Sequence, residues 1–283
     1  MTPPTVSSIT EARAAVAALR DGGRSVALVP TMGALHDGHL ALVARAREVA
    51  DVVVTSIFVN PLQFGPAEDF DRYPRTLPAD AAALDRAGVD LLFAPSVPDM
   101  YPEGRTMISL AAGPVGDVLE GRVRPGHFDG MLTVVAKLLH IVGPDVVLFG
   151  QKDAQQVFLV RRMVADLDVP VRVEVVPTVR EPDGLARSSR TRYLSADDRR
   201  RALALPSALR AAAAAADRGT ERMLEAARGE LEGREGVEPD YLVAVDPATF
   251  RPVPDRYRGP ALVLVAARVG GTRLIDNALV SLA

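Results

Sequence analysis

The sequence contains no cysteine, has no long hydrophobic run, and carries little net charge. Without cysteine the chain has no disulfide framework, which fits a reducing compartment. No apolar run approaches the roughly 18 residues that suggest a transmembrane helix, and Met1-Thr2-Pro3-Pro4 lacks the basic and apolar regions of a signal peptide. A net charge of −3 argues against general nucleic-acid binding. We therefore expect a cytoplasmic protein whose partners include neither membrane nor nucleic acid.

The chain is long enough to bury a large core. Its 283 residues are 48% hydrophobic and 24% charged, which is ordinary for a soluble globular protein. This length is compatible with one large domain or with two.

One stretch combines a buried strand, a glycine turn and the start of a helix. Residues Val26 to Val29 form an apolar run without polar alternation, which is typical of a strand covered on both faces. Pro30 should end the strand because it has no N–H group to donate. Leu40, Val43 and Ala44 then repeat at helical spacing, so a helix should begin near Gly38 with its positive dipole end toward the loop.

Two histidines, His36 and His39, are spaced His-x-Gly-His at this predicted helix start. Each imidazole can donate a hydrogen bond to an anion, and Gly38 leaves room for a phosphate, so the pattern favours a nucleoside triphosphate site. Neither a Walker A sequence nor a Gly-x-Gly-x-x-Gly fingerprint is present. The alternatives are two surface histidines at a helix cap, or a zinc site. With four histidines and no cysteine, the supply of zinc ligands is small.

Strands and helices alternate through the first 176 residues. Buried strands are expected at 51–60, 89–93, 146–149 and 171–176, with helices at 79–87, 127–142 and 154–167 between them. This alternation predicts an α/β fold with a Rossmann-like, doubly wound parallel sheet. Beyond Pro177 the pattern changes to helices near 196 and 221–231 and strands at 241–245 and 261–269. We expect a domain of residues 1–180 and a smaller C-terminal α+β domain of residues 181–283.

Polar loops follow three of the predicted parallel strands, at the edge where such sheets bind ligands. They hold the histidine pair, the amides of 60–63, and the turn 150–153. The Lys152 ammonium can reach an anion there, although a solvated surface lysine is the alternative. Asp153 can complement a helix dipole or accept ribose hydroxyls. Residues 187–190, Arg-Ser-Ser-Arg, can bind phosphate oxygens or can form an ordinary polar loop.

Taken together, these residues resemble the pantoate–β-alanine ligases, a family within the His-x-Gly-His nucleotidyltransferase superfamily. The resemblance extends from about residue 24 to 194. The matching segments, in the family's order, are Pro-Thr-Met-Gly-Ala-Leu-His-Asp-Gly-His (30–39), Ile-Phe-Val-Asn-Pro-Leu-Gln-Phe-Gly (57–65), Tyr-Pro-Arg-Thr (73–76), Arg-Pro-Gly-His-Phe (124–128), Phe-Gly-Gln-Lys-Asp (149–153), Val-Arg-Glu-Pro-Asp-Gly-Leu-Ala (179–186) and Ser-Ser-Arg (188–190).

The resemblance implies a reaction in which ATP and pantoate form pantoyl adenylate and pyrophosphate, and β-alanine then displaces AMP. It implies that ATP is bound by Met32, Gly33, Ala34, Leu35, His36, Asp37, Gly38, His39, Gly150, Gln151, Lys152, Asp153, Val179, Arg187, Ser188, Ser189 and Arg190. The groups expected to stabilise charge on the reacting phosphates are His36, His39, Lys152, Ser188, Ser189 and Arg190.

Other implied residues serve the remaining substrates. Gln63 and Gln156 match the pantoate amides, Gln63 also lies at the β-alanine site, and we place Asn60 and Arg124 with pantoate. Asp80 matches a carboxylate near Mg²⁺, which would help pyrophosphate leave. The C-terminal domain would act as a lid that excludes water from the adenylate. A homodimer is implied by the resemblance alone.

Three positions depart from the family pattern: Arg187 stands where Met is usual, Thr191 where Asn is usual, and Ala79 where an acidic residue often precedes Asp80.

Two alternative functions remain at this point. One is nucleotidyl transfer to an alcohol phosphate, against which the 60–63 loop and the separate C-terminal domain argue. The other is a non-catalytic nucleotide-binding protein, against which the complete set of expected phosphate-contacting residues argues.

Overall fold

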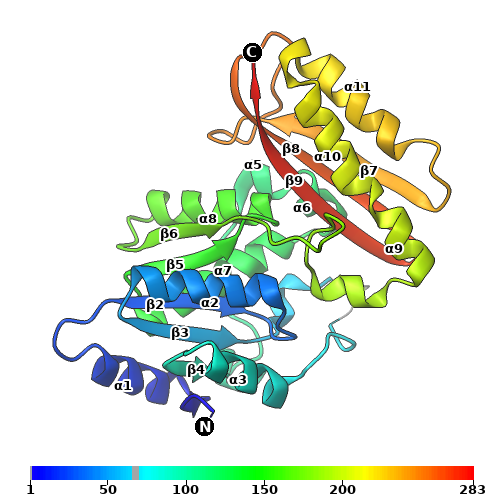
Figure 1. Ribbon diagram of the computed structural model, residues 1–283. Coiled ribbons are helices and arrows are strands. Elements are labelled where there is room, and N and C mark those ends of the chain that lie inside the picture. Colours follow the sequence, from blue (N-terminus) through cyan, green and yellow to red (C-terminus); the bar gives the residue numbers. More distant parts are fainter. Residues whose placement is uncertain (1, 66–69) are drawn as a thin grey trace. The chain divides into compact units, whose positions relative to one another are not determined.

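The computed structural model describes residues 2–65 and 70–283, and the chain divides into two compact units. Unit 1 comprises Met1–Gly150 and Leu159–Val176, and unit 2 comprises Gln151–Phe158 and Pro177–Ala283 (Figure 1). The short stretch Gln151–Phe158 therefore clusters with the C-terminal part of the chain, although it follows a strand of unit 1.

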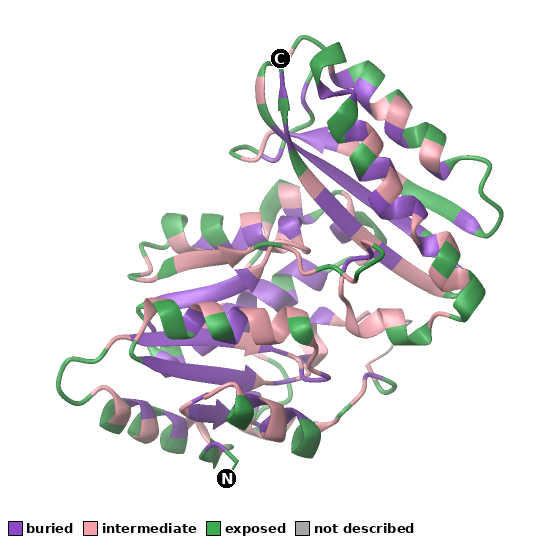
Figure 2. Ribbon diagram, in the orientation of Figure 1, coloured by how far each residue is buried: buried purple, intermediate pink, exposed green. Residues whose placement is uncertain are grey.

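Unit 1 is built on a parallel sheet with the strand order β1-β4-β3-β2-β5-β6. The strands are β1 (Thr5–Val6), β2 (Val26–Thr31), β3 (Val52–Ile57), β4 (Leu91–Phe93), β5 (Val146–Gly150) and β6 (Arg172–Val176). The central strands are almost completely buried, as Figure 2 shows. The order reverses direction at β2 and β5, which makes the sheet doubly wound. The predicted fold class is confirmed.

Helices cover both faces of this sheet. Those between the strands are α1 (Ile9–Leu19), α2 (Asp37–Val49), α3 (Leu77–Arg86), α7 (His127–Val142) and α8 (Ala154–Asp166), the last of which begins in unit 2. Helices α2 and α3 pack Val43, Ala46 and Leu84 against one face of the sheet in a shared apolar cluster. On the other face α1 contacts α7, and α7 contacts β2.

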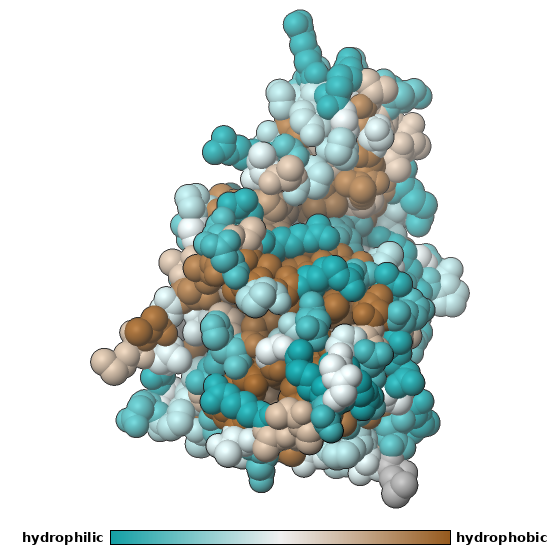
Figure 3. Space-filling view, turned by 90° about the vertical axis from the view of Figure 1, so that its left-hand side faces the viewer, coloured by the Kyte–Doolittle hydropathy of each residue, from teal (hydrophilic) through white to brown (hydrophobic). Residues whose placement is uncertain are grey.

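Shorter helical turns lie in the connections that follow β3 and β4. They are η1 (Pro61–Gln63), α4 (Val97–Met100), α5 (Gly113–Gly116) and α6 (Glu120–Val123). None of the helices in the described ranges is long and apolar enough to cross a membrane. On the side presented in Figure 3, hydrophobic side chains lie among hydrophilic ones, as is usual for protein surfaces.

The expectation that Pro30 ends its strand is wrong. Pro30 lies within β2 and pairs in register with Ser56 of β3. On its other side β2 pairs with β5 only at Ala27 and Leu28. That ladder ends before Pro30, so a residue without an N–H group is tolerated there. The two-residue strand β1, which pairs with β4, was not predicted.

Unit 2 contains a three-stranded antiparallel sheet with the order β7-β8-β9. Its strands are β7 (Val237–Val245), β8 (Gly259–Val269) and β9 (Thr272–Leu282), and its helical elements are η2 (Ser189–Tyr193), α9 (Ala196–Ala202), α10 (Ala204–Ala214), η3 (Ala216–Arg218) and α11 (Thr220–Leu231). Leu205 and Met223 join Val263 and Val265 of β8 in one apolar core. The α+β prediction for this part is confirmed, but strand β9 was missed.

Candidate active site

The histidine pair lies at the start of α2, as the motif predicts. His36 is the N-cap residue, and its Nδ1 accepts a hydrogen bond of 3.1 Å from the Gly38 N–H. The Nδ1 of His39 accepts from the His36 N–H at 3.3 Å, and the two rings lie 4.1 Å apart between centroids. Each side chain therefore caps a backbone N–H that the helix leaves without an intrahelical partner.

This capping decides which ring nitrogen carries the proton. A nitrogen that accepts a hydrogen bond is unprotonated, so the neutral form of each ring has its proton on Nε2. His36 and His39 are thereby prepared to donate from Nε2 to an anion at the positive end of α2. The zinc alternative has no support within the described residues, where no group of three or more metal-binding side chains occurs.

A buried carboxylate, Asp80 of α3, holds the loop of residues 32–35 that precedes the histidines, which we call the motif loop. Its Oδ2 accepts from the Ala34 N–H at 3.0 Å and its Oδ1 from the Leu35 N–H at 2.9 Å, while the Thr76 hydroxyl donates to Oδ2 at 3.0 Å. Ala34 has a φ angle of 50°, in the left-handed region that non-glycine residues rarely adopt. Asp80 stabilises this uncommon backbone conformation.

These contacts bear on the expected Mg²⁺ ion. Mg²⁺ is usually held by one or two carboxylates together with substrate phosphates. Both oxygens of Asp80 already accept hydrogen bonds from the motif loop, and Ala79 beside it brings no second carboxylate. The residues around Asp80 therefore do not make a magnesium site by themselves, and they support a positioning role for this carboxylate.

Replacing Asp80 with asparagine distinguishes a role in positioning the motif loop from a role as a Mg²⁺ ligand. The amide has one acceptor oxygen, and its NH₂ group would face a backbone N–H, leaving a buried donor unpaired at a cost of about 1–3 kcal/mol. We expect kcat to fall by roughly 10-fold or more because the histidines lose their alignment. A titration of activity with Mg²⁺ provides the check, with the exposed Asp85→Asn on the same helix as the control. Restoration of full activity by excess Mg²⁺ would favour the ligand role instead.

Asn60, the N-cap of η1, and Gln63, its last residue, form a buried amide network after strand β3. The Asn60 Nδ2 donates to Gln63 Oε1 and to the Gly130 carbonyl, each at 3.0 Å. Its Oδ1 accepts from the Leu62 N–H at 3.2 Å and from the Tyr101 hydroxyl at 2.8 Å. With its oxygen held by Asn60, Gln63 directs Nε2 toward the Met32 sulfur at 3.4 Å. Gln63 thus presents an N–H donor beside the motif loop.

The start of α7 supports the same segment. The His127 Nδ1 lies 2.8 Å from the Gln63 carbonyl oxygen, so this nitrogen carries the proton and donates. The Arg124 Nη1 lies 3.0 Å from His127 Nε2, which accepts from it. A Cβ atom on Gly130 would come within 2.1 Å of the Leu62 carbonyl oxygen, so only glycine allows this close approach. Arg124, expected at pantoate, is therefore anchored against the Gln63 segment.

Removing the Tyr101 hydroxyl should affect the small substrates selectively. Burial raises the pKa of the Tyr101 phenol above its ordinary value, so the hydroxyl stays a donor to Asn60. In Tyr101→Phe the loss of one hydrogen bond should raise the KM of pantoate or β-alanine by about 2- to 10-fold. Steady-state kinetics with each substrate varied in turn, and with Tyr257→Phe as the control, provide the check. An equal rise in the KM of ATP would show that the loss of the Tyr101 hydroxyl does not act selectively on the pantoate and β-alanine sites.

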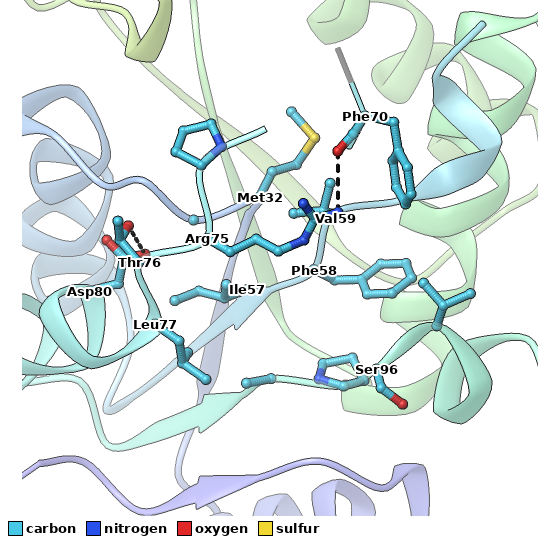
Figure 4. A pocket seen from close by; sticks show the side chains of 15 residues that line it. Met32, Ile57, Phe58, Val59, Phe70, Arg75, Thr76, Leu77, Asp80 and Ser96 are labelled. Carbon is cyan, nitrogen blue, oxygen red and sulfur yellow. Dashed lines mark hydrogen bonds between the residues drawn. The ribbon is translucent and has the colours of Figure 1, made fainter. Parts of the chain in front are cut away.

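A cavity of about 330 Å³ opens beside the motif loop at the carboxyl ends of β3 and β4 (Figure 4). It is lined by Met32, Gly33, Ile57, Phe58, Val59, Phe70, Pro74, Arg75, Thr76, Leu77, Asp80, Ala94, Pro95, Ser96 and Val97. Arg75 donates to the carbonyl oxygens of Phe70 and Tyr73 and so fixes one wall. The mostly apolar lining with a few polar groups is typical of a small-molecule pocket.

In unit 2, the turn after β5 holds the predicted Lys152. The carbonyl oxygens of Gln151 and Lys152 both accept hydrogen bonds from the Asn277 side chain, at 2.9 and 3.0 Å. Asp153 accepts from the Gln156 N–H at 3.1 Å and thus caps the start of α8. Gln156 lies in the first turn of that helix.

The second predicted phosphate-binding segment of unit 2 is a tight backbone hairpin. The Arg187 N–H donates to the Val179 carbonyl at 2.9 Å, and Ser188 begins η2 by accepting from the Arg190 N–H. The unexpected guanidinium of Arg187 forms an ion pair of 2.9 Å with Glu181. Thr191, the second departure, donates its hydroxyl to the Ser188 carbonyl at 2.7 Å. Both substitutions are therefore accommodated by local partners.

Four residues that hold these groups in place were not predicted from the sequence: Tyr101, Gly130, Asp276 and Asn277. His127, by contrast, lies in the matched segment 124–128 and stands at the start of α7. Tyr101 and Asn277 act on residues 41 and 125 positions away, and no local spacing indicates such partners.

A doubly wound sheet with the His-x-Gly-His pair at the helix after β2 is the arrangement that the sequence resemblance implies for a His-x-Gly-His nucleotidyltransferase. Comparison with known proteins narrows this class. The family model described as Pantoate-beta-alanine ligase matches residues 4–279. The chain belongs to the pantoate–β-alanine ligase family.

Individual relatives agree with this membership. The pantothenate synthetase of Leifsonia xyli is 60% identical over 257 residues, which cover 91% of this chain and 89% of the relative. A crystal structure of pantothenate synthetase from Thermus thermophilus has 51% identity and a TM-score of 0.91, and the match covers 97% of this chain and 98% of that one. The pantoate-beta-alanine ligase of Francisella tularensis, solved in complex with beta-gamma ATP and beta-alanine, has 34% identity and a TM-score of 0.81, covering 98% and 97%.

Family membership decides between the functions that the sequence left open. The chain is an enzyme that catalyses the ATP-dependent condensation of pantoate with β-alanine. Neither transfer to an alcohol phosphate nor non-catalytic binding is supported.

Proposed function

We propose that the condensation proceeds through pantoyl adenylate. The pantoate carboxylate oxygen attacks the α-phosphorus of ATP, and the bond to the pyrophosphate oxygen breaks. The amine of β-alanine then attacks the acyl carbon, loses a proton and displaces AMP, leaving the amide of pantothenate. No covalent enzyme intermediate is required.

The observation that carries this proposal is the pair of Nε2 donors at the start of α2. Negative charge grows on the phosphate oxygens as pyrophosphate leaves, and preorganised donors stabilise such charge most effectively. Because Nδ1 of His36 and of His39 is held by a backbone N–H, each Nε2–H is fixed before substrate arrives. We assign His39 mainly to hydrogen-bond donation to the phosphates.

The other phosphate-contacting residues supply cationic and hydroxyl donors. We assign Lys152 and Arg190 to neutralising the phosphate oxygens, and Ser188 and Ser189 to donating hydroxyl hydrogen bonds. Arg187 is held by Glu181, so we expect it to support the hairpin more than the nucleotide. A Mg²⁺ ion bound with ATP would neutralise the leaving pyrophosphate.

We assign pantoate to the cavity beside Met32. Its apolar lining suits the branched carbon skeleton of pantoate, and the oriented Gln63 amide can donate to the polar end of the substrate. Gln156, Asn60 and Arg124 stay predicted contacts or supports of the pantoate and β-alanine sites. The division into a nucleotide- and pantoate-binding domain (1–180) and a C-terminal lid (181–283) likewise stays a prediction.

A cytoplasmic homodimer is a further proposal, carried over from the family resemblance. Sedimentation equilibrium on the purified chain tests the dimer: a mass near twice the 30.1 kDa of one chain supports it, and a monomeric mass at micromolar concentration contradicts it. Fractionation of the source cells tests the location.

A product assay tests the two-step order. The purified enzyme is mixed with ATP, Mg²⁺ and pantoate, with and without β-alanine, and pyrophosphate and AMP are followed. With ATP present, we expect a stoichiometric burst of pyrophosphate that requires pantoate but not β-alanine. Continuous AMP release should occur only when β-alanine is added. Absence of pyrophosphate until β-alanine is present would contradict a first step that precedes amine binding.

A further inference from the structure

Strand β9 carries two adjacent polar residues that are almost fully buried. Asp276 is 3% exposed and Asn277 is 4% exposed, in a strand whose neighbouring positions include the apolar Leu274 and Ile275. Buried polar groups are costly unless they are hydrogen-bonded. The partners of these two side chains therefore indicate why polar residues stand at these positions.

The side-chain amide of Asn277 holds the turn that contains Lys152. Its Nδ2 donates to the carbonyl oxygens of Gln151 at 2.9 Å and Lys152 at 3.0 Å, which uses both amide hydrogens. Its Oδ1 lies 3.4 Å from Gln151 Nε2, which donates to it. The backbone of Lys152 is thus held by a side chain 125 residues further along the chain.

Asp276 holds the hairpin that leads to Ser188. Its two carboxylate oxygens accept from Arg180 Nη1 at 2.7 Å and from Nη2 at 3.0 Å, a bidentate pair. The same guanidinium also donates to the Asn277 carbonyl at 3.3 Å. Arg180 stands next to Val179, whose carbonyl accepts from the Arg187 N–H. Two neighbouring residues of one strand therefore secure both phosphate-binding segments of unit 2.

We propose that Asp276 and Asn277 are positioning residues for the reaction, which we name the β9 clamp. The clamp fixes the backbone at Lys152 and at the Val179–Arg187 hairpin in one arrangement within unit 2. It reduces the freedom that the Lys152 ammonium would otherwise lose when it meets the phosphates. This inference rests on the proposed role of Lys152.

The first test replaces Asn277 alone. Asn277→Ala should lower the rate of pantoate-dependent pyrophosphate release by about 10- to 100-fold, with little change in the KM of β-alanine. Asn277→Asp keeps the side-chain volume but turns an oxygen toward two carbonyl oxygens, so it should lose at least as much. Leu279→Ala, at an exposed position of the same strand, is the matched control. Circular dichroism of each variant shows that it is folded.

A double-mutant cycle shows whether the clamp acts through Lys152. If it does, adding Asn277→Ala to Lys152→Ala should cause little further loss, because the group that the clamp positions is already absent. Losses that multiply in the double variant would overturn the proposal, since they would show an effect independent of Lys152. Near-normal activity of Asn277→Ala and Asn277→Asp beside an impaired Lys152→Ala would overturn the clamp but leave the role of Lys152 intact. A fully active Lys152→Ala would overturn both.

Discussion

Replacing His39 with alanine should slow pantoate-dependent pyrophosphate release by at least ~100-fold, the usual effect of removing one transition-state donor. The loss follows from the geometry at the start of α2, where the His39 Nδ1 accepts from the His36 N–H and leaves Nε2 to donate. The fold should persist, since one capping bond costs only about 0.5–2 kcal/mol. His140→Ala, which removes an exposed histidine of α7, is the control.

Two amide substitutions at position 39 separate donation from capping. In His39→Asn the side-chain oxygen can lie near the position of Nδ1 and retain the cap, but no group reaches the Nε2 position. In His39→Gln an amide N–H can lie near the position of Nε2 instead. We expect His39→Gln to retain more of the pyrophosphate release rate than His39→Asn. The reverse order would show that His39 serves the helix and not the phosphates.

Replacing Lys152 with alanine should have an effect of similar size, at least ~100-fold on the first step. Lysine is scarce in this chain: only Lys137 and Lys152 occur among the 33 lysines and arginines. An ammonium is a compact charge on a flexible stem, whereas guanidinium is a planar fork, so the two do not substitute for each other at a tight anion site. We therefore expect Lys152→Arg to recover only part of the rate.

Rapid-quench measurement of pyrophosphate in a single turnover provides the check for Lys152. The chain's other lysine offers the matched control, because Lys137 lies over the Tyr101 ring at 5.7 Å in unit 1 and Lys137→Ala removes the same charge. A Lys152→Ala enzyme with the wild-type single-turnover rate would remove this residue from the first step.

The fold could be predicted where the pattern along the chain reflects its burial. Strands β2, β3 and β5 are covered on both faces, so they read as nearly continuous apolar runs. Helix α7 repeats its apolar residues at helical spacing over His127–Val142. Strand β9 was missed because polar residues such as Arg273 and Asp276 interrupt its apolar pattern. Their partners, Asp240 and Arg180, lie far away in the sequence.

The side chains expected to contact substrate could be predicted from the sequence. The residues that orient those side chains could not. His36, His39 and Lys152 stand in local motifs, whereas the orientation of each depends on its contacts in the folded chain. Asp80 illustrates this: the family resemblance implies a carboxylate near Mg²⁺, but its oxygens accept hydrogen bonds from the Ala34 and Leu35 N–H groups. Such long-range hydrogen bonds form only when the chain is folded.

Attack of the pantoate carboxylate on the α-phosphorus of ATP can be followed with an oxygen isotope. Pantoate labelled with ¹⁸O in its carboxylate is converted with ATP and β-alanine, and the products are analysed by mass spectrometry. We expect one ¹⁸O atom in AMP, because the oxygen that bonded to phosphorus leaves with AMP when the amine attacks. Label found in inorganic phosphate together with ADP, or AMP without label, would contradict it.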